Sequence, residues 1–482
     1  MINYKKLGMK SGLEIHQQLD TTKLFCNCPS ILRQDEPDFE INRKLHAVAG
    51  EDGKIDIAAS HEAGLDRKFV YQGYDTTCLV ELDEEPPHEI NQGALETALH
   101  ISLLLNAKIL PIAQIMRKTV IDGSNTSGFQ RTVMIAREGY IETSEGRVGI
   151  DGIFLEEDSA RPVSREKDKV VYRLDRLGIP LIEIATAPDI KTAEQAKEAA
   201  LKIGDILRSC KVRRGIGTIR QDINISIKPE QKRSNRVELK GFQDPKIMIK
   251  TIDNEINRQL KFIEEKKENP SEVRNVLADA TSEFQRPMPG SARMYPETDL
   301  PLLKISKTMV NSAKKNLPKL KSEVEKELRK EGLNDEYIGM LFKQNKIDIY
   351  RELFYLLPKP NLVAKLLLLF PKELASKKKI SSGKVEKVLE DNYSSVLSLF
   401  IKKKIKEDQI KTVLSKLVDG ATLEEASKFE KIDFGDIEEQ IHKIIKSKPG
   451  LNPNAYMGLV MKEFGSKVSG AEAMEIIKKY VS

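Results

Sequence analysis

Acidic residues that interrupt apolar, strand-like segments are the groups in this sequence best suited to chemistry. They stand in four segments: Glu14, with His16, in GLEIH; Glu156 in FLEED; Glu183 in PLIEI; and Asp222 in IRQDINISI. A carboxylate surrounded by isoleucine and leucine is costly to bury unless it is paired, protonated or bound to a metal. Several such groups on one sheet would repel one another without a cation, so the set predicts a site for a divalent metal ion.

The ligand types narrow the choice of ion. Hard cations such as Mg²⁺ prefer carboxylate oxygens and keep water or phosphate as further ligands. His16 is a less usual partner for Mg²⁺ and would also suit Mn²⁺. For each acid taken singly, the alternative is an ion pair with a nearby arginine such as Arg161, Arg173 or Arg176. Both interpretations stay open for single residues, and the metal interpretation is favoured for the set.

Basic residues stand next to these acids. In VRRGIGTIRQDINISI, residues 212–227, strict alternation predicts a strand with Arg220 and Asp222 on one face. An arginine beside a carboxylate can hold a phosphate together with its metal ion, although an ordinary salt bridge is the open alternative. The sequence has no Gly-x-x-x-x-Gly-Lys-Ser/Thr run and no kinase-type glycine-rich loop. A nucleotide would therefore have to bind on a sheet, through metals and arginines.

The composition is that of a globular protein. Of 482 residues, 40% are hydrophobic and 32% are charged, and the net charge is only +6, so any nucleic-acid surface must be local. We expect no secretory leader and no membrane span, because the N-terminus lacks an apolar core and the longest apolar run, residues 361–370, is short and contains Lys365. Four cysteines are too few for a disulfide framework, which favours a cytoplasmic setting.

Residues before about 303 predict an α+β fold. Hairpin-like spacing of alternating runs favours a largely antiparallel sheet, and helical patterns at residues 91–106 and 192–210 would cover it. The second helix is opened by a Thr-x-x-Gln capping box. The predicted strands are residues 11–19, 146–158, 170–174, 181–186, 217–227 and 236–239.

The chain changes character near residue 303. Lys/Leu/Glu-rich helical patterns follow it to the C-terminus. We therefore predict three domains: a mixed α+β domain over residues 1–303, an all-α helical domain over 304–412 and a small helical tail domain over 413–482.

Eight segments resemble one known family. They are GLEIHQQL, KLFCNCPS, GSNTSGFQRT, LEEDSAR, YRLDRLGIPLIEIATAPDI, RRGIGTIRQDINISI, RVELKGFQ and RPMPGSARMYPETDLP. Together they resemble the E-type subunit of the archaeal-type glutamyl-tRNA(Gln) amidotransferase, the sister of the bacterial B-type subunit in the GatB/GatE family. The resemblance is dense over residues 10–303. Near the C-terminus, PNAYMGLVMKEF resembles the tail domain that both subunit types share.

The resemblance implies a fold and a reaction. The fold would be an antiparallel-sheet cradle of the glutamine-synthetase-like class, followed by a helical domain and a tail that contacts tRNA. The reaction would convert Glu-tRNA(Gln) to Gln-tRNA(Gln): ATP phosphorylates the glutamyl side chain, and ammonia then displaces the phosphate. The ammonia would come from a separate asparaginase-like protein, the D-type subunit, within a cytoplasmic hetero-oligomer.

The resemblance also implies roles for single residues, with ATP and Mg²⁺ (or Mn²⁺) as cofactors. The implied metal ligands are His16, Glu156 and Glu183, with Asp222 and Glu14 as the next choices. As hypotheses from the expected geometry, Arg220, Arg176 and Lys118 would contact ATP phosphates, and Asp175 would orient an arginine or ammonia. The predicted catalytic residues are Glu14, Arg176, Asp175 and Arg220.

Two departures from the family pattern bear on these expectations. The B-type subunit often has a Cys-x-Cys…Cys-x-x-Cys zinc site, whereas this chain offers Cys26, Cys28 and Cys78, with the fourth position near Asp75. A closed zinc site prefers four nitrogen or sulfur ligands, so we expect buried thiols and no zinc. The E-type subunit normally carries an inserted domain similar to one in bacterial aspartyl-tRNA synthetases, but residues 264–279 leave room here only for a short polar helix or loop.

Two other functions compete with this one. A small-molecule carboxylate–amine ligase of the glutamine-synthetase type is the nearer alternative, but it would need neither the tail nor the basic helical region. A noncatalytic RNA-binding module is the second alternative. The acidic set argues against it, because RNA repels such a surface.

Overall fold

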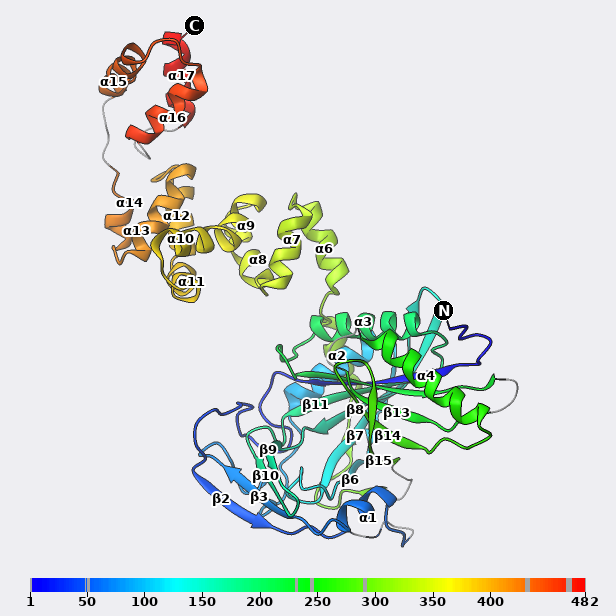
Figure 1. Cartoon of the computed structure of the whole chain (residues 1–482). Coiled ribbons are helices and arrows are strands. Elements are labelled where there is room, and N and C mark those ends of the chain that lie inside the picture. Colours follow the sequence, from blue (N-terminus) through cyan, green and yellow to red (C-terminus); the bar gives the residue numbers. More distant parts are fainter. Residues whose placement is uncertain are drawn as a thin grey trace. The chain divides into compact units, whose positions relative to one another are not determined.

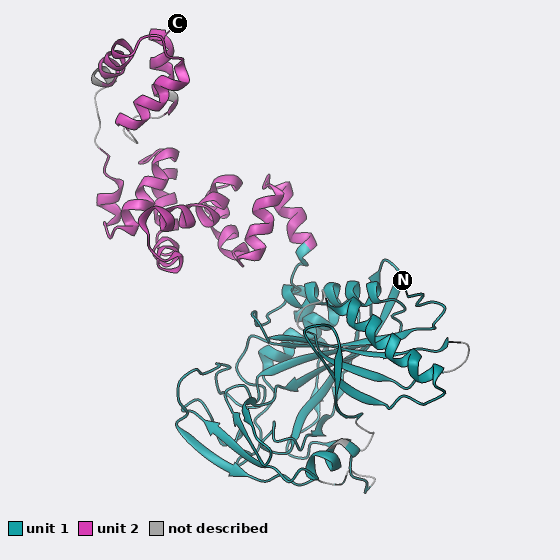
Figure 2. Cartoon of the chain, viewed as in Figure 1, with its two compact units in different colours: residues 1–321 teal, residues 322–482 magenta. Residues whose placement is uncertain are grey.

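The structure is a computed structural model that describes residues 2–47, 49, 53–229, 233–242, 247–288, 293–429, 434–464 and 470–481. Parts of two motifs quoted above, residues 243 and 289–292, lie outside the described residues. The chain divides into two compact units, residues 1–321 and residues 322–482 (Figure 2). Each unit is described by itself.

A large mixed sheet forms the body of unit 1 (Figure 1). In the described part of the chain it has eleven strands in the order β15-β14-β13-β12-β1-β11-β8-β7-β6-β16, with β4 beside β7. All of these neighbours pair antiparallel except β13 and β14, which are parallel. The strands are β1 Lys10–Gln18, β4 Lys108–Ile109, β6 Ile115–Thr119, β7 Phe129–Thr143, β8 Gly146–Glu157, β11 Pro180–Thr186, β12 Ile219–Ser226, β13 Val237–Phe242, β14 Glu272–Val276, β15 Ser282–Pro287 and β16 Met294–Pro296.

Smaller elements surround this sheet. Four strands form a second sheet in the order β2-β3-β10-β9, in which β3 and β10 are parallel, and β5 pairs with β17. These strands are β2 Phe39–Arg43, β3 Lys68–Gly73, β5 Ile112–Ala113, β9 Arg161–Arg165, β10 Lys169–Arg173 and β17 Leu303–Lys304. The helices of unit 1 are α1 Ile57–Ala63, α2 Gln92–Leu104, α3 Ala193–Ser209, α4 Met248–Glu264 and α5 Lys307–Lys315.

The large sheet has one buried face and one open face. Successive side chains of a strand point to opposite faces, so Leu13 and Ile15 of β1 enter the core while Glu14 and His16 point the other way. Helices α2, α3 and α4 pack on the apolar face, as Figure 1 shows for α3 and α4. Each strand therefore carries its polar residues to the open face because its apolar residues are fixed in the core.

Helix α3 begins with side-chain caps close to those expected. The Thr192 Oγ1 accepts a hydrogen bond from the Gln195 backbone N–H at 3.0 Å, as the Thr-x-x-Gln pattern predicts. The Gln195 side chain, however, accepts from the N–H of Lys191 at 2.8 Å. Both hydrogen bonds satisfy backbone donors at the start of the helix, which fixes the residue at which α3 begins.

Unit 2 is helical throughout its described part. One apolar core joins residues between Val324 and Ala426, and another joins residues between Ile437 and Ile477. The elements are α6 Lys321–Lys330, α7 Asp335–Lys343, α8 Ile347–Leu356, α9 Pro360–Leu368, α10 Phe370–Lys378, α11 Ser382–Glu390, α12 Tyr393–Ile401, η3 Glu407–Gln409, α13 Ile410–Val418, α14 Leu423–Ser427, α15 Phe434–Ser447, α16 Pro453–Phe464 and α17 Gly470–Val481. None of the helices in the described part of the chain combines the length and apolar composition needed to cross a bilayer.

The α+β organisation, with helices after a sheet-rich region, is confirmed. The strand predicted at residues 170–174 is confirmed as β10, although it lies in the smaller sheet, where it pairs with β3. One expectation was wrong. Residues 264–279, expected as a polar helix or loop, contain β14, because Val273 enters the core and the backbone pairs with β13. The domain limits at residues 303 and 412, and the glutamine-synthetase-like class, stay predictions.

The core of unit 1 makes a testable contrast. Ile184 of β11 is fully buried, whereas Ile216 is 98% exposed. We expect Ile184→Ala to lower the free energy of unfolding by about 2–5 kcal/mol, since it removes buried methyl groups and leaves a cavity. Ile216→Ala should change it by no more than about 0.5 kcal/mol. Urea unfolding followed by circular dichroism measures both, and equal effects would contradict the placement of Ile184 in the core and of Ile216 in solvent.

Candidate active site

A cavity of about 770 Å³ lies on the open face of the large sheet. Its lining comes from strands that are far apart in the sequence, from β1 to β15. The charged residues and the histidine that line it are Glu14, His16, Lys118, Glu156, Glu183, Arg220, Asp222, Arg236, Glu238, Lys240, Arg286 and Arg293. The volume is within the range of small-molecule sites, and the lining contains both acidic and basic side chains.

His16, Glu156 and Glu183 form the first group of converging ligands, which we call trio A. One ligand atom of each lies within 4.8 Å of the others. His16 on β1 stands directly opposite Glu183 on β11, with 3.3 Å between Nε2 and Oε2. The Nζ of Lys118 on β6 reaches Glu156 Oε1 at 2.8 Å and Glu183 Oε2 at 3.4 Å. Strand register therefore assembles the trio, and one lysine partly neutralises it.

Polar neighbours hold Glu156 in place. Thr132 Oγ1 donates to Glu156 Oε1 at 2.9 Å, and Gln130 Nε2 donates to Oε2 at 3.0 Å. Both donors come from β7, where Thr132 stands opposite Glu156. The carboxylate is thus fixed on the cavity side, whereas the next residue, Glu157, turns away and accepts a hydrogen bond from the backbone N–H of Arg131 at 3.1 Å.

The charges of trio A perturb one another. Burial raises the pKa of Glu156, and the neighbouring Glu183 carboxylate raises it further. Burial would also raise the pKa of Glu183, but Lys118 and His16 outweigh it and the pKa falls well below the usual range. Burial opposes protonation of His16, yet its hydrogen bond to Glu183 raises the pKa of the imidazole. Such a group of mutually repelling acids is stabilised by any added cation.

Glu14, Asp222 and Glu238 form a second group, trio B, whose ligand atoms also lie within 4.8 Å of one another. Glu14 stands opposite Asp222 across β1 and β12. The Nζ of Lys240 reaches Asp222 Oδ2 at 2.7 Å and Glu238 Oε1 at 2.5 Å. Burial raises the pKa of Glu14, and Glu238 adds to the effect. Trio B therefore repeats the pattern of trio A, with carboxylates gathered about one lysine.

A glycine shapes the edge of trio B. Gly241 has a φ of +93°, in the left-handed region that favours glycine. It lies within the irregularity between β12 and β13, and its N–H donates to Asp222 Oδ1 at 3.2 Å. The bulge thus turns a backbone donor toward the carboxylate, which holds Asp222 in the cavity wall.

The predicted phosphate-binding arginines differ in position. Arg220 lines the cavity, and its Nη2 donates to Asp158 Oδ1 at 3.2 Å. Arg176 is not part of the cavity lining; it donates to the backbone carbonyls of Ser159 at 2.7 Å and Ala160 at 2.9 Å. Asp158 follows β8 and also accepts from Gln18 at 2.6 Å. Arg220 thus lines the cavity, whereas Arg176 stabilises the segment that contains Ser159 and Ala160.

Asp175 is buried away from the cavity. It accepts from Arg161 Nη2 at 2.6 Å and from the backbone N–H of Arg33 at 2.9 Å. Asp175 thus forms an ion pair with Arg161 outside the cavity. The predicted role of Asp175 in orienting an arginine or ammonia stays a prediction.

Three cysteines meet outside the cavity. Cys26, Cys28, Cys78 and Glu81 each bring a ligand atom within 4.8 Å of the others. Hydrogen bonds from the Cys26 and Cys28 thiols lower the pKa of Cys78. The fourth position is Glu81, and the expectation of Asp75 was wrong, because Asp75 is exposed and pairs with Arg33 at 2.5 Å.

This donor set does not match a four-sulfur zinc site. The carboxylate of Glu81 forms an ion pair with the ammonium of Lys23, and both side chains are only 2% exposed. Lys23 also donates to the carbonyl of Leu174 at 3.1 Å. The one oxygen ligand is therefore already paired with a cation. Our expectation that zinc is absent stays a prediction, which elemental analysis of the purified chain tests directly.

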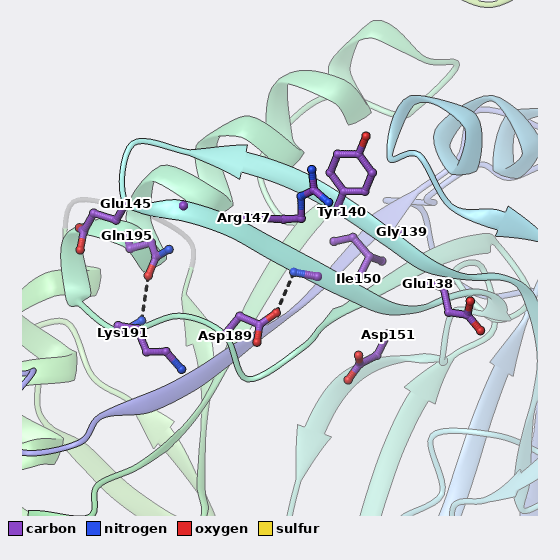
Figure 3. A pocket seen from close by; sticks show the side chains of 12 residues that line it. Glu138, Gly139, Tyr140, Glu145, Arg147, Ile150, Asp151, Asp189, Lys191 and Gln195 are labelled. Atoms are coloured by element: carbon purple, nitrogen blue, oxygen red, sulfur yellow. Dashed lines mark hydrogen bonds between the residues drawn. The ribbon is translucent and has the colours of Figure 1, made fainter.

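A second hollow of about 610 Å³ lies beside the β7–β8 hairpin (Figure 3). Two of its charged side chains have local partners: Asp189 accepts from the N–H of Gly149 at 3.0 Å, and the guanidinium of Arg147 lies 4.0 Å from the centre of the Tyr140 ring. None of the predicted site residues lines it. It therefore adds nothing to the candidate site.

Several cavity residues were missed at the sequence level. Glu238 interrupts the apolar run VEL in the same way as Glu183 interrupts PLIEI, and Lys240 follows on the same face. This pattern could have found both residues. Arg286 and Arg293 had no such signal, because neither stands in an apolar alternating run.

Comparison with known proteins gives one consistent result. The profile of the GatB/GatE catalytic domain matches residues 9–311. The chain is 58% identical over 290 residues to the E-type subunit of glutamyl-tRNA(Gln) amidotransferase from Methanocaldococcus jannaschii, a match covering 59% of this chain and 45% of that protein. It is 52% identical over 285 residues to the E-type subunit from Methanococcus maripaludis, covering 58% and 44%. The chain thus spans less than half the length of these two relatives.

A third relative matches along the whole chain. The E-type subunit from Archaeoglobus fulgidus is 33% identical over 625 aligned positions, which cover 99% of both proteins. The alignment is longer than the 482 residues of this chain. The relative therefore carries residues for which this chain has no counterpart, as expected from the short segment at residues 264–279.

The buried pair beside the cysteines makes a further prediction. Lys23→Met leaves Glu81 buried without a cation, so we expect a loss of about 3–5 kcal/mol in the free energy of unfolding. Lys23→Met with Glu81→Gln removes both charges and keeps an acceptor for the N–H of Cys78, which donates to Glu81 at 2.9 Å. The double variant should recover most of the loss in chemical denaturation. A double variant as unstable as the single one would show that the pair does not act by charge compensation.

Proposed function

This chain belongs to the GatB/GatE family, and on that premise we propose that it amidates Glu-tRNA(Gln) to Gln-tRNA(Gln) at the expense of ATP. Its relatives are named as E-type subunits of glutamyl-tRNA(Gln) amidotransferase. The observation that carries the proposal is the pair of carboxylate trios in one cavity. Two groups of buried acids suit a reaction in which phosphate charge moves between a nucleotide and a carboxylate.

The reaction has two steps. The side-chain carboxylate of the glutamyl group attacks the γ-phosphate of ATP, which forms an acyl phosphate and releases ADP. Ammonia then attacks the acyl carbon and phosphate leaves, which forms the amide. A carboxylate is a poor acyl donor and an acyl phosphate is a good one, so the first step activates the second. No nucleophile from the protein is required.

The trios would hold the cofactor. His16, Glu156 and Glu183 would bind one Mg²⁺, and Glu14, Asp222 and Glu238 would bind another. The donor sets fit, because they consist of carboxylates and one imidazole, which Mg²⁺ or Mn²⁺ accepts. Bound there, the cation would supply charge neutralisation for the transferred phosphoryl group.

The basic residues would position the reacting groups. Lys118 lies against Glu156 and Glu183 and can turn its ammonium to the glutamyl carboxylate or to the phosphate. Arg220 stands opposite His16 across β1 and β12 and is fixed by Asp158. Holding both reactants in line replaces a bimolecular encounter with a positioned one, which accounts for much of the rate in such reactions.

The ammonia would be supplied by a partner. We propose an asparaginase-like protein, the D-type subunit, in a cytoplasmic hetero-oligomer, as the source. The helical unit, residues 322–482, would contact the tRNA, because a small free substrate would need no such unit.

The acidic cavity makes a prediction about catalysis. Glu183→Gln keeps the size of the side chain and removes a charge from trio A, so we expect ATP hydrolysis dependent on Glu-tRNA(Gln) to fall by about 100-fold or more. Arg220→Gln should lower the same rate by a similar factor. The matched control is Glu142→Gln, whose side chain is 60% exposed and pairs with exposed Arg147. Near-wild-type rates in both cavity variants would remove these residues from the site.

The division of labour makes another prediction. The full-length chain alone, given Glu-tRNA(Gln), ATP, Mg²⁺ and ammonium chloride, should form Gln-tRNA(Gln), because the synthetase step needs no glutaminase chemistry. Chelating the metal with EDTA should abolish product, and added Mg²⁺ should restore it. Absence of product from folded chain would contradict the proposal. ATP hydrolysis stimulated by free glutamate without tRNA would instead support a small-molecule ligase.

A further inference from the structure

The two edges of the large sheet come together above the cavity. Edge strand β15 ends at Pro287 and edge strand β16 begins at Met294, so only residues 288–293 separate them. An extended chain of that length spans at most about 25 Å, whereas the strands lie at opposite ends of the sheet order. The sheet must therefore curl around the cavity, so that residues at its two edges face the same space.

An arginine stands at each of these edges. Arg286 lies in β15, and Arg293 lies one residue before β16. Both are half-buried and both line the cavity. The Nε of Arg293 donates to the carbonyl of Thr119 on β6 at 3.2 Å, which fixes the guanidinium at the cavity wall.

Neither guanidinium has a carboxylate partner among the described residues, where ion pairs are counted to 4.0 Å. By contrast, Lys118, Lys240 and Arg220 in the same cavity each contact at least one acid. Burial lowers the pKa of Arg293, and the positive charge of Arg286 lowers it further; Asp56, Glu156 and Glu238 act against this from farther away. Two neighbouring, half-buried cations without a counterion are unfavourable, so the arrangement calls for an anion.

The anion must fit between the arginines and the acidic wall. Glu238 and Lys240 of the trio B region line the same cavity. Guanidinium groups bind phosphate oxygens through two parallel hydrogen bonds. A polyphosphate is the anion that binds arginines on one side and cation-loaded carboxylates on the other. RNA backbone phosphates would more readily meet exposed lysines than half-buried arginines inside a cavity.

We propose that Arg286 and Arg293 form a clamp for the phosphates of the nucleoside triphosphate, at the convergence of the two sheet edges. The inference rests on the proposed function and deepens it. It also places the main phosphate contact on these two arginines and not on Arg220, whose charge is already met by Asp158. One anion bound to both arginines joins the first and last strands of the sheet.

The test uses the full-length chain, Mg²⁺ and a non-hydrolysable ATP analogue. Isothermal titration calorimetry on Arg286→Gln and Arg293→Gln should show about 10- to 100-fold weaker nucleotide binding, the effect of losing a charge-assisted contact. The nucleotide affinity of Arg293→Lys should lie between those of the wild type and Arg293→Gln, because lysine keeps the charge but lacks the two parallel N–H donors of a guanidinium group. Arg147→Gln, a matched arginine outside the cavity, should bind as the wild type does. Thermal unfolding of each variant checks that it is folded.

A second arm distinguishes the source of the phosphate. Fluorescence anisotropy with labelled tRNA should give the same affinity for Arg286→Gln and Arg293→Gln as for the wild type. Weaker tRNA binding with unchanged nucleotide binding would assign the pair to RNA and overturn the clamp. Unchanged binding of both ligands would overturn it as well. A wild-type chain that binds no nucleotide at all would instead refute the proposed function, so the two failures are distinguishable.

Discussion

Mutual repulsion among carboxylates on one sheet face is the constraint on which the rest of this site depends. In trio A, Glu156 and Glu183 outweigh Lys118 by one formal charge, and in trio B, three acids outweigh Lys240 by two. Partial burial makes this excess costly, because the cavity wall solvates charge less well than water. The hydrogen bonds from Thr132 and Gln130 fix the geometry but cannot remove the excess. The arrangement is stable as a cation site and is poorly explained as a set of ordinary ion pairs.

The opposite face of the same strands keeps these acids in position. A slip of one residue in β1 would carry Ile15 to the cavity and His16 into the core, so every apolar contact beneath α3 resists it. Ile15, Ile182 and Ile223 are all fully buried, and they stand beside His16, Glu183 and Asp222 in the sequence. The positions of the site residues are thus fixed by a core that makes no contact with substrate. A substitution in that core would therefore also move the side chains that do the chemistry.

Local pattern predicted much of this, and its failures share one cause. Alternation located β1, β8, β11 and β12, and the acids within them, because an acid in an apolar strand is visible in a short window of sequence. The fourth member of the cysteine group is Glu81 rather than Asp75. Its position depends on the turn after Cys78 and on the buried Lys23, which no short window of sequence contains together. The strand β14 was missed because pairing with β13 and burial of Val273 stabilise it from outside its own polar sequence. Arg286 and Arg293 were missed for the same reason, since only the curling of the sheet brings its two edges together.

The spacing of the two trios along β1 limits how they can act. Glu14 and His16 are two residues apart, which places their Cα atoms about 7 Å from each other in a strand. Paired metal ions that share one bridging oxygen lie only about 3.5–4 Å apart, so ligands spaced this way suit two separate centres better than one bridged pair. Trio B lies toward β13, and trio A lies beside Lys118 on β6. Arg293 donates to Thr119 on β6 and is attracted by Glu156 of trio A as well as by Glu238 of trio B. On the proposed function, the two arginines would hold the polyphosphate beside the cation-loaded trios, and Lys118 would hold the glutamyl carboxylate. The transferred phosphoryl group would then lie between them, above β1, where Glu14 and His16 of that strand can reach it.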